Sequence, residues 1–465
     1  MQSFELGGGK LCDTLPAALR AAILSGDPAA GEKLPSKRRL AERYGISVNT
    51  VQNAYEQLIA EGYIVARERS GYFVSDFPPT LPVVASPPAA EPVEDVPLPP
   101  LLDLVTNTAD GTRFPFSLWS RLTRRVLCEE GEQLLLAQPA AGATALRSAI
   151  ASYLREARGM LVQDTQVVIG AGTEYLYHLL IQLLGRERCF GLENPGHSKI
   201  ARIYALNGVD FRPVPLDEGG ASPDAAERLG VQVLHISPNH HFPTGTVMPA
   251  TRRRALLHWV QAEDRYIIED DYDSEFRFTG RPIPPLFGMD ESGRVIYVNT
   301  FSKTIAPSMR ISYMVLPPVL AQRYRELLGF YACPVPAFEQ HILARFLSEG
   351  HFALHLHRMR SFYRTRRDAV IHLLRTAPFA NRIRIREADA GLHFLLEITT
   401  HRSDAALRQL LEKVGIRVAF LGDYYIDQKP HPDTHTLVLN YSGVDPRGLE
   451  QGICALCAVL QGDTP

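Results

Sequence analysis

Residues 295–310 read VIYVNTFSKTIAPSMR. The stretch begins with a run of β-branched and aromatic residues that is typical of a buried strand. It continues into a segment in which one lysine, Lys303, stands among hydroxyl side chains, with Arg310 seven residues further on. Ligands of open α/β sheets bind beyond the carboxyl ends of the strands. The stretch therefore predicts a strand of a mainly parallel sheet that ends in a ligand-binding loop.

Four other apolar runs have the length of strands and are separated by helical patterns. They lie at 167–169, 188–192, 231–236 and 266–270. Strands that alternate with helices are typical of an α/β fold with a mainly parallel sheet. We therefore predict one large α/β domain over 101–463.

Two of these strands also end in polar groups. The strand at 167–169 runs into the glycine turn 172–174, which opens a helix whose free N–H groups and dipole can hold a phosphate. For this segment taken alone, a plain βα turn is the alternative. The strand at 266–270 ends in an acidic segment, DDYDSE over 270–275. For this acidic segment, a solvated loop or a metal site remains an alternative to a contact with a ligand.

The groups at the three strand ends suit a single ligand, pyridoxal 5'-phosphate (PLP). A partly desolvated lysine has a lowered pKa, so its neutral amine can attack the aldehyde of PLP and form a Schiff base. A carboxylate can hold the pyridine nitrogen protonated, and a tyrosine can donate to the phenolic oxygen. Hydroxyls, an arginine and a helix N-terminus can neutralise the phosphate. We therefore predict PLP as the cofactor and no bound metal.

The composition of the 465-residue chain restricts the possible partners. The formal net charge is -2, so any contact with DNA must come from a local patch rather than from the whole molecule. The sequence has no apolar run of the ~18 residues that a membrane span needs, and it does not begin with a secretion signal. Six scattered cysteines fit a reducing compartment, and Cys454 and Cys457 are expected to be two buried thiols on a helix. We expect a cytoplasmic protein with no membrane partner.

The segment 77–100 separates two modules. It contains nine prolines and no glycine, a composition that favours an extended polyproline II spacer. We therefore predict a small N-terminal domain over 10–76, a linker over 77–100 and the large domain over 101–463.

The small module has the pattern of a winged helix-turn-helix. Residues 15–24 predict a first helix. Ser36 and Gly45 are residue types that cap the two ends of a second helix. Ser47 then caps a third helix, and two short strand patterns joined by the sequence RERS predict a hairpin.

The third helix begins with small polar side chains, where a recognition helix presents groups to base edges. Basic residues on the preceding helix and in the hairpin are placed to contact phosphates or an adjacent groove. The predicted DNA contacts are Ser36, Lys37, Arg38, Ser47, Asn49, Thr50 and Arg67. A small helical domain with a solvated basic face is the alternative.

Both modules resemble known families. Residues 34–51, LPSKRRLAERYGISVNTV, are similar to the signature of the GntR family of bacterial regulators. Val48 stands where that family usually has an arginine, which removes an expected phosphate or guanine contact. In the large module, the order Gly-Thr, Asp-x-Tyr, Ser-Lys and Arg resembles the fold type I aminotransferases. The whole chain therefore resembles the MocR/GabR family of PLP-dependent regulators.

The resemblance implies a role for each cofactor residue. Lys303 would form the Schiff base with PLP, Asp270 would face the pyridine nitrogen, and Tyr272 would face the phenolic oxygen. The phosphate would be held by Gly172, Thr173, Glu174, Thr300, Ser302 and Arg310.

Two histidine segments complete the implied site. The turn that carries His197 is similar to a Pro-Gly-aromatic turn of the family, which would place His197 near the ring face; a plain surface turn is the alternative. Phe242 stands where the enzymes have an asparagine that contacts the cofactor. His240 or His241 would take over that contact.

Two further departures bear on function. Glu174 stands where the family usually has glutamine, and it places a negative charge near the phosphate. Val438 stands on the strand that normally carries the arginine for a substrate carboxylate, unless Arg358 or Arg360 replaces that arginine. We therefore expect a transcriptional regulator that binds operator DNA and senses PLP or an amine or amino-acid adduct of it, with vitamin B6 or amino-acid metabolism genes as candidate targets. An active aminotransferase is the alternative, and the family implies a head-to-tail homodimer.

Overall fold

The computed structural model describes residues 11–76, 100–107, 109–279, 283–427, 431–444 and 446–461. The chain divides into two compact units, with the boundary between residues 98 and 99. All but the last residue of the expected linker, 77–100, lies outside the described residues.

The small unit is built from helices and a hairpin around one apolar core. Its elements are α1 (Leu11–Leu24), α2 (Lys37–Tyr44), α3 (Val48–Ala60), β1 (Ile64–Arg67) and β2 (Gly71–Val74). β1 and β2 pair antiparallel, and the core contains Leu19, Leu40 and Tyr55, none of which is exposed. The predicted winged helix-turn-helix is confirmed.

The caps of α2 and α3 fix the turn between them. The Ser36 hydroxyl accepts a hydrogen bond from the Arg39 N–H at 3.3 Å, and the Ser47 hydroxyl accepts one from the Thr50 N–H at 3.1 Å. Gly45 ends α2 with a φ of 63°, a left-handed conformation that glycine adopts without steric cost. The sequence thus sets the angle at which α3 leaves the turn.

The large unit is organised around an eight-stranded sheet with the order β4-β11-β10-β9-β8-β5-β6-β7. The strands from β10 to β6 in this order are parallel, whereas β11 is antiparallel to both of its neighbours. The strand bounds are β4 (Val167–Gly170), β5 (Phe190–Asn194), β6 (Phe211–Asp217), β7 (Gly220–Ala221), β8 (Val233–Ile236), β9 (Tyr266–Asp270), β10 (Val295–Thr300) and β11 (Ser312–Val315). The predicted α/β fold with a mainly parallel sheet is confirmed.

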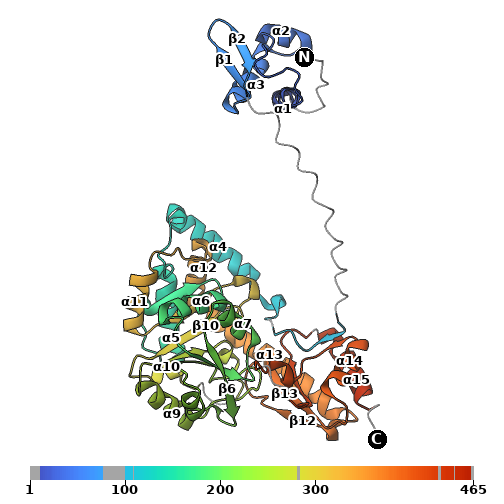
Figure 1. Ribbon diagram of the computed structural model, residues 1–465. Helices are drawn as coiled ribbons and strands as arrows, with labels where there is room; N and C mark the ends of the chain where they lie inside the picture. Colours follow the sequence, from blue (N-terminus) through green and yellow to red (C-terminus); the bar gives the residue numbers. More distant parts are fainter. Residues whose placement is uncertain are drawn as a thin grey trace. The chain divides into compact units, whose positions relative to one another are not determined.

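Helices cover both faces of this sheet (Figure 1). Successive side chains of a strand point to opposite faces, so Tyr297 packs in one core and Ile296 and Val298 in another. The Tyr297 face is covered by α4 (Phe116–Glu130), α5 (Thr144–Arg158), α8 (Pro223–Arg228), α9 (Ala250–Gln261), α10 (Leu286–Met289) and α12 (Ala337–Ser348). The other face is covered by α6 (Thr173–Leu184), α7 (Ser198–Leu206) and α11 (Pro318–Leu328).

The C-terminal part of the large unit has its own three-stranded antiparallel sheet, of order β12-β13-β15. Its elements are α13 (His351–Thr376), β12 (Ile383–Arg386), β13 (His393–Ile398), α14 (Asp404–Lys413), β15 (Thr436–Asn440) and α15 (Pro446–Gln461). A parallel pair of two-residue strands, β3 (Leu102–Asp103) and β14 (Ile416–Arg417), joins the start of the unit to this part.

One thiol expectation is wrong. Cys454 is exposed and Cys457 is half-buried, and both are free thiols. α15 buries Ile453, Leu456 and Leu460 against the core, and Cys454 falls on the opposite side of the helix.

Among the strands of the large unit that were not predicted are β6 and β11. β6 contains Pro213 and Pro215, which argue against a strand because proline cannot donate to the ladder. β11 lies between the ligand-binding loop and a pair of prolines, and its four residues, SYMV, form no uninterrupted apolar run.

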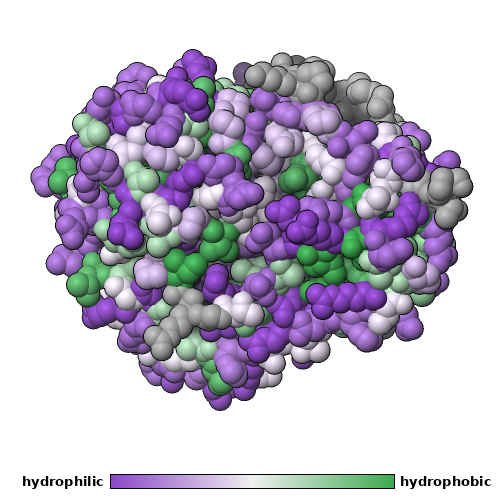
Figure 2. Space-filling model, turned by 90° about the horizontal axis from the view of Figure 1, so that it is seen from below, coloured by the Kyte–Doolittle hydropathy of each residue, from purple (hydrophilic) through white to green (hydrophobic). Residues whose placement is uncertain are grey.

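The surface of the protein is consistent with the burial of most apolar side chains in the cores. The face shown in Figure 2 is mostly hydrophilic, with hydrophobic residues in small separate patches. Among the described residues, no helix is both long enough and apolar enough to cross a membrane.

Two glycines with left-handed backbones test the packing of the large unit. A Cβ at Gly142 would lie 2.6 Å from Ile169 Cγ1, whereas a Cβ at Gly159 would meet no atom within 4 Å. Both alanine variants carry the ~1–2 kcal/mol cost of a left-handed residue. We expect Gly142→Ala to lose about 1–3 kcal/mol more than Gly159→Ala, because only the first overpacks a core. Urea unfolding followed by tryptophan fluorescence measures the difference, and equal losses would contradict it.

Candidate functional site

A cavity of about 530 Å³ opens at the carboxyl ends of β5, β8, β9 and β10. Its volume lies within the ~300–1,000 Å³ of typical small-molecule sites. Ten of the predicted cofactor residues line it: Thr173, Glu174, His197, His241, Asp270, Tyr272, Thr300, Ser302, Lys303 and Arg310. Gly172 lies beside it, where a Cβ would come within 2.3 Å of Arg310 Nη2.

Lys303 lies in the turn that follows β10, and burial changes the pKa of its amine. Its Nζ donates a hydrogen bond to the Asn107 carbonyl oxygen. Burial lowers the pKa of Lys303 to about 8, and the negative charge of Asp273 opposes the shift. A larger fraction of this amine is therefore neutral near pH 7 than in an ordinary lysine, which makes it a better nucleophile.

Asp270, at the end of β9, has one oxygen held by the protein and one left over. The Tyr177 hydroxyl donates to Asp270 Oδ2 at 2.5 Å. Asp270 Oδ1 is buried without a hydrogen-bond partner among the described residues. An orphaned buried acceptor is costly unless a donor reaches it. A protonated ring nitrogen in the cavity is a donor of the required kind.

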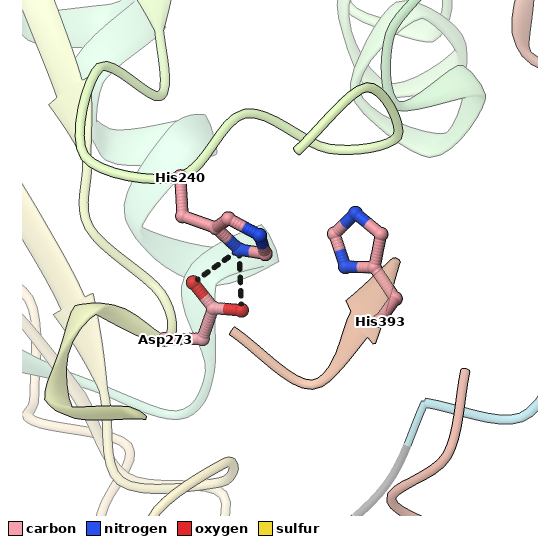
Figure 3. A group of neighbouring side chains, drawn as sticks. All are labelled: His240, Asp273 and His393. Atoms are coloured by element: carbon pink, nitrogen blue, oxygen red, sulfur yellow. Dashed lines mark hydrogen bonds and ion pairs between the residues drawn. The ribbon is translucent and has the colours of Figure 1, made fainter. Parts of the chain in front are cut away.

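The hydroxyl of Tyr272 lies next to a hydrogen-bonded pair of a histidine and a carboxylate, His240 and Asp273. His240 Nδ1 lies 2.9 and 3.1 Å from the two oxygens of Asp273, as Figure 3 shows, so it donates to that carboxylate. Tyr272 Oη lies 3.4 Å from the same Nδ1, which has no free lone pair with which to accept. Burial, together with the charge of Asp273, holds the pKa of Tyr272 well above its usual value. The hydroxyl proton is therefore kept and is available to an acceptor in the cavity.

His393, on β13, completes the cluster in Figure 3. Its Nε2 donates to the Pro243 carbonyl at 3.1 Å, and its ring centroid lies 4.6 Å from that of His240. Of the two histidines proposed to replace the asparagine, His240 therefore belongs to this buried cluster and His241 lines the cavity.

His241 and Glu193 are both uncharged near neutral pH. Burial raises the pKa of the Glu193 carboxyl to about 8 and lowers that of His241 to about 3. His241 Nε2 lies 3.4 Å from Glu193 Oε2. Glu193 therefore adds no negative charge to this end of the cavity near neutral pH.

The opposite end of the cavity gathers cations and hydroxyls. Arg310 Nη2 donates to Glu174 Oε2 at 2.5 Å, and Lys199 Nζ contacts the other oxygen of Glu174. The Ser302 hydroxyl is buried and has no hydrogen-bond partner within the described ranges. The Thr300 hydroxyl accepts from the Ser302 N–H at 3.1 Å and so keeps its own proton for an acceptor. These groups suit a phosphate.

The acidic segment after β9 is not a solvated loop. Asp271, Asp273 and Glu275 are each 3% exposed or less. Asp271 is satisfied by Arg158 at 3.0 Å, by the Tyr297 hydroxyl at 2.6 Å and by the Asn239 amide at 2.7 Å. The segment is therefore buried and largely paired, and Asp270 Oδ1 and Glu275 Oε2 are its carboxylate oxygens that are buried without a hydrogen-bond partner among the described residues.

Several residues that line the cavity were missed. Those with polar or titratable side chains include Tyr177, Glu193, Lys199 and His235. Tyr177 lies four residues after Thr173 on α6, so helical spacing alone places the two on one face. His235, on the buried strand β8, has its Nε2 3.7 Å from Asp270 Oδ2 and was hidden within an apolar run.

The position expected for a carboxylate-binding arginine offers none. Val438, on β15, is 1% exposed and is packed in the C-terminal sheet. Arg358 lines a different cavity beside α13, and Arg360 Nε donates to the Glu275 carbonyl at 2.5 Å. The cationic side chains that line the cofactor cavity are those of Lys199, Lys303 and Arg310.

The predicted DNA contacts lie on α2, α3 and the hairpin of the small unit. Asn49, Arg38 and Arg67 are exposed. The Ser36 and Ser47 hydroxyls serve as helix caps, and the Thr50 hydroxyl lies 2.8 Å from that of Ser47. Lys37 is half-buried, with its Nζ 3.4 Å from Gln52 Oε1. In the first turn of α3, Asn49 is therefore an exposed polar side chain, whereas Thr50 is half-buried.

Comparison with known proteins identifies a family for each unit. Residues 100–433 match the family "Aminotransferase class I and II", and residues 11–74 match "Bacterial regulatory proteins, gntR family". Two relatives span nearly the whole chain. The "Probable rhizopine catabolism regulatory protein MocR" of Rhizobium meliloti is 34% identical over 94% of this chain and 91% of its own length. The "HTH-type pyridoxine biosynthesis transcriptional regulator PdxR" of Corynebacterium glutamicum is 32% identical over 88% of each chain.

A solved structure shares the fold of the large unit. The kynurenine aminotransferase of Pyrococcus horikoshii superposes with a TM-score of 0.69 at 22% identity, over 78% of this chain and 91% of that one. The aminotransferase family match and the free Asp270 Oδ1 and Ser302 hydroxyl agree on the cofactor, which is PLP.

The pKa of Lys303 predicts how the protein takes up PLP. Protonated amine is unreactive, so the rate of attachment should rise about tenfold per pH unit below pH 8 and level off above it. Stopped-flow absorbance of lysine-bound PLP, measured from pH 6 to 9.5 on the cofactor-free protein, gives this profile. Lys303→Arg should show no band, and a rate that still rises tenfold per pH unit up to pH 9.5, as expected for an ordinary lysine with a pKa of 10.5, would contradict the assignment.

Proposed function

Because this chain belongs to the MocR/GabR family, in which a GntR-type DNA-binding domain precedes an aminotransferase-like domain, we propose that it is a transcriptional regulator that binds operator DNA and senses PLP. One observation carries the proposal. A single chain holds both a winged helix-turn-helix with an open recognition helix and a cavity lined by ten of the residues expected around PLP.

Each part of the cavity has a role in this proposal. Bound PLP supplies an aldehyde and an electron-withdrawing ring. Asp270 would keep the ring nitrogen protonated, Tyr272 would donate to the phenolic oxygen and Lys303 would supply the amine. The phosphate would be held by Gly172, Thr173, Thr300, Ser302 and Arg310, at the N-terminus of α6. His197, whose ring centroid lies 5.4 Å from that of Phe242, and His241 border the ring.

We propose that PLP itself, rather than a carboxylated amine, is the signal. Val438 offers no guanidinium to a carboxylate, Arg358 lines a different cavity, and Arg360 donates to the Glu275 carbonyl. Burying a carboxylate without a charged donor is costly. The printed name of one relative refers to pyridoxine biosynthesis, which supports vitamin B6 genes as the target of this chain.

The domain boundaries that we propose are 10–76 for the winged helix-turn-helix, 77–100 for the linker and 101–463 for the sensor domain. We also propose a head-to-tail homodimer, in which two recognition helices read two half-sites. PLP would act by binding the two arrangements of the dimer with different affinity and so shifting their populations.

A second candidate function is aminotransfer. The observation that favours it is the complete set of cofactor residues in the cavity. We expect turnover with amino acids and keto acids at least a thousandfold below the ~10 s⁻¹ typical of enzymes, because the cavity has no arginine at the position that would bind the carboxylate of the substrate. We also expect PLP to change the operator affinity and γ-aminobutyrate to leave it unchanged. Steady-state assays and electrophoretic mobility shifts measure the two, and turnover near 10 s⁻¹ would favour the enzyme.

The recognition-helix assignment predicts the effect of two substitutions. We expect Asn49→Ala and Thr50→Ala each to weaken operator binding about tenfold or more, since one good base contact is worth ~1–3 kcal/mol. PLP absorbance should not change. The measurement is fluorescence anisotropy with DNA from upstream of the protein's own reading frame, after footprinting locates the operator. Gln57→Ala, near the far end of α3, is the matched control. Specific binding that survives both substitutions would refute the assignment.

A further inference from the structure

Glu174 pairs with the two cationic side chains that the phosphate of PLP would need, Arg310 and Lys199. We propose that the Glu174 carboxylate competes with the phosphate of PLP for these cations. This competition weakens the binding of PLP, so that the occupancy of the cavity follows the free concentration of the cofactor. This inference rests on the proposed function, because it assigns Glu174 a part in PLP sensing.

The geometry places one carboxylate between two cations. Glu174 Oε2 accepts from Arg310 Nη2 at 2.5 Å, and Glu174 Oε1 contacts Lys199 Nζ. All three side chains line the cavity. Lys199 and Arg310 are 60% and 53% exposed, so both remain accessible to a ligand that enters.

Arg310 lies beside the start of α6. Its guanidinium approaches the backbone at Gly172 so closely that a Cβ there would come within 2.3 Å of Nη2. Gly172 caps α6, and Glu174 lies in the first turn of the same helix. A phosphate that contacts Arg310 and the start of α6 is therefore close to the Glu174 carboxylate as well.

The charges favour competition rather than support. Two cations and one carboxylate leave a net charge of about +1 for a phosphate that carries about -1.5 to -2. Although burial opposes ionisation, the hydrogen bonds from Lys199 and Arg310 lower the pKa of Glu174 to about 2. Glu174 is therefore negatively charged near neutral pH, and it repels the phosphate.

The consequence is a site that releases its cofactor. Lys303 and Asp270 still select PLP by its aldehyde and ring, whereas the weakened phosphate contact limits its residence. A sensor needs a dissociation constant near the concentration that it reports, unlike an enzyme that keeps its cofactor permanently.

The test is the equilibrium dissociation constant of PLP for Glu174→Gln, which keeps the shape and removes the charge. We expect PLP to bind about tenfold more tightly than to the wild type, a difference of ~1.4 kcal/mol. Titration of the cofactor-free full chain, followed by the absorbance of lysine-bound PLP, measures the constant. Pyridoxal, which has the same aldehyde and ring but no phosphate, should bind both proteins equally. Glu174→Asp, which keeps the charge, should remain within about threefold of the wild type.

Glu218→Gln, an exposed position outside the cavity, is the matched control for loss of one negative charge. An unchanged or weaker affinity of Glu174→Gln for PLP would overturn the inference, and so would an equal gain for pyridoxal. Either result would leave PLP sensing intact, because the wild type would still bind PLP. A wild-type protein that takes up no PLP would instead refute the proposed function.

Discussion

Arg158 is the group that allows the acidic loop after β9 to lie inside the protein. Its guanidinium, 5% exposed, sits 3.0 Å from Asp271 and 3.6 Å from Glu275. A buried carboxylate without a partner is strongly destabilising, and breaking a buried pair costs ~3–5 kcal/mol. Because Arg158 ends α5, on the face of the sheet away from α6, the helical layer on one side of the sheet stabilises the ligand cavity at its edge.

The parallel pairing of β9 and β10 converts this buried loop into a site. Asp270 lies opposite Val298 in the register, so the loops that follow the two strands emerge at one edge. Asp270 and Tyr272 come from one loop, and Lys303 comes from the other. The first turn of α6 adds the phosphate end from β4, which lies two strands away from β10. No local segment of the chain could form this cavity alone.

The sequence predicted the parts of the site that share a fixed spacing with a strand end. Lys303, Asp270 and Tyr272 each follow a predicted strand, and parallel strands bring such residues together whatever the details of packing. The small unit was equally accessible, because caps such as Ser47 act within one turn of the helix.

What was missed depends on contacts between distant segments. His235 lies inside a buried strand, where a polar residue cannot be told from core without its partner. The pairing of Lys199 with Glu174 joins the first turns of α7 and α6, which only the folded sheet brings together. The exposure of Cys454 depends on how α15 is rotated against the core, which the apolar content of the segment does not fix. Local sequence patterns therefore predicted which residues lie in the site, whereas the contacts that set their charges and hydrogen bonds depend on the tertiary fold.

Val48, the first residue of α3, bears on which DNA sequences the protein would bind. Val48 leaves 42% of its surface exposed at the start of the proposed recognition helix. In the major groove, the C5 methyl of thymine is the group to which an aliphatic side chain can pack. A binding site chosen through Val48 would therefore contain thymine at one position of each half-site, and a 5-methylcytosine there would present the same methyl group. DNA methylation at that base would then mimic the preferred letter instead of blocking recognition.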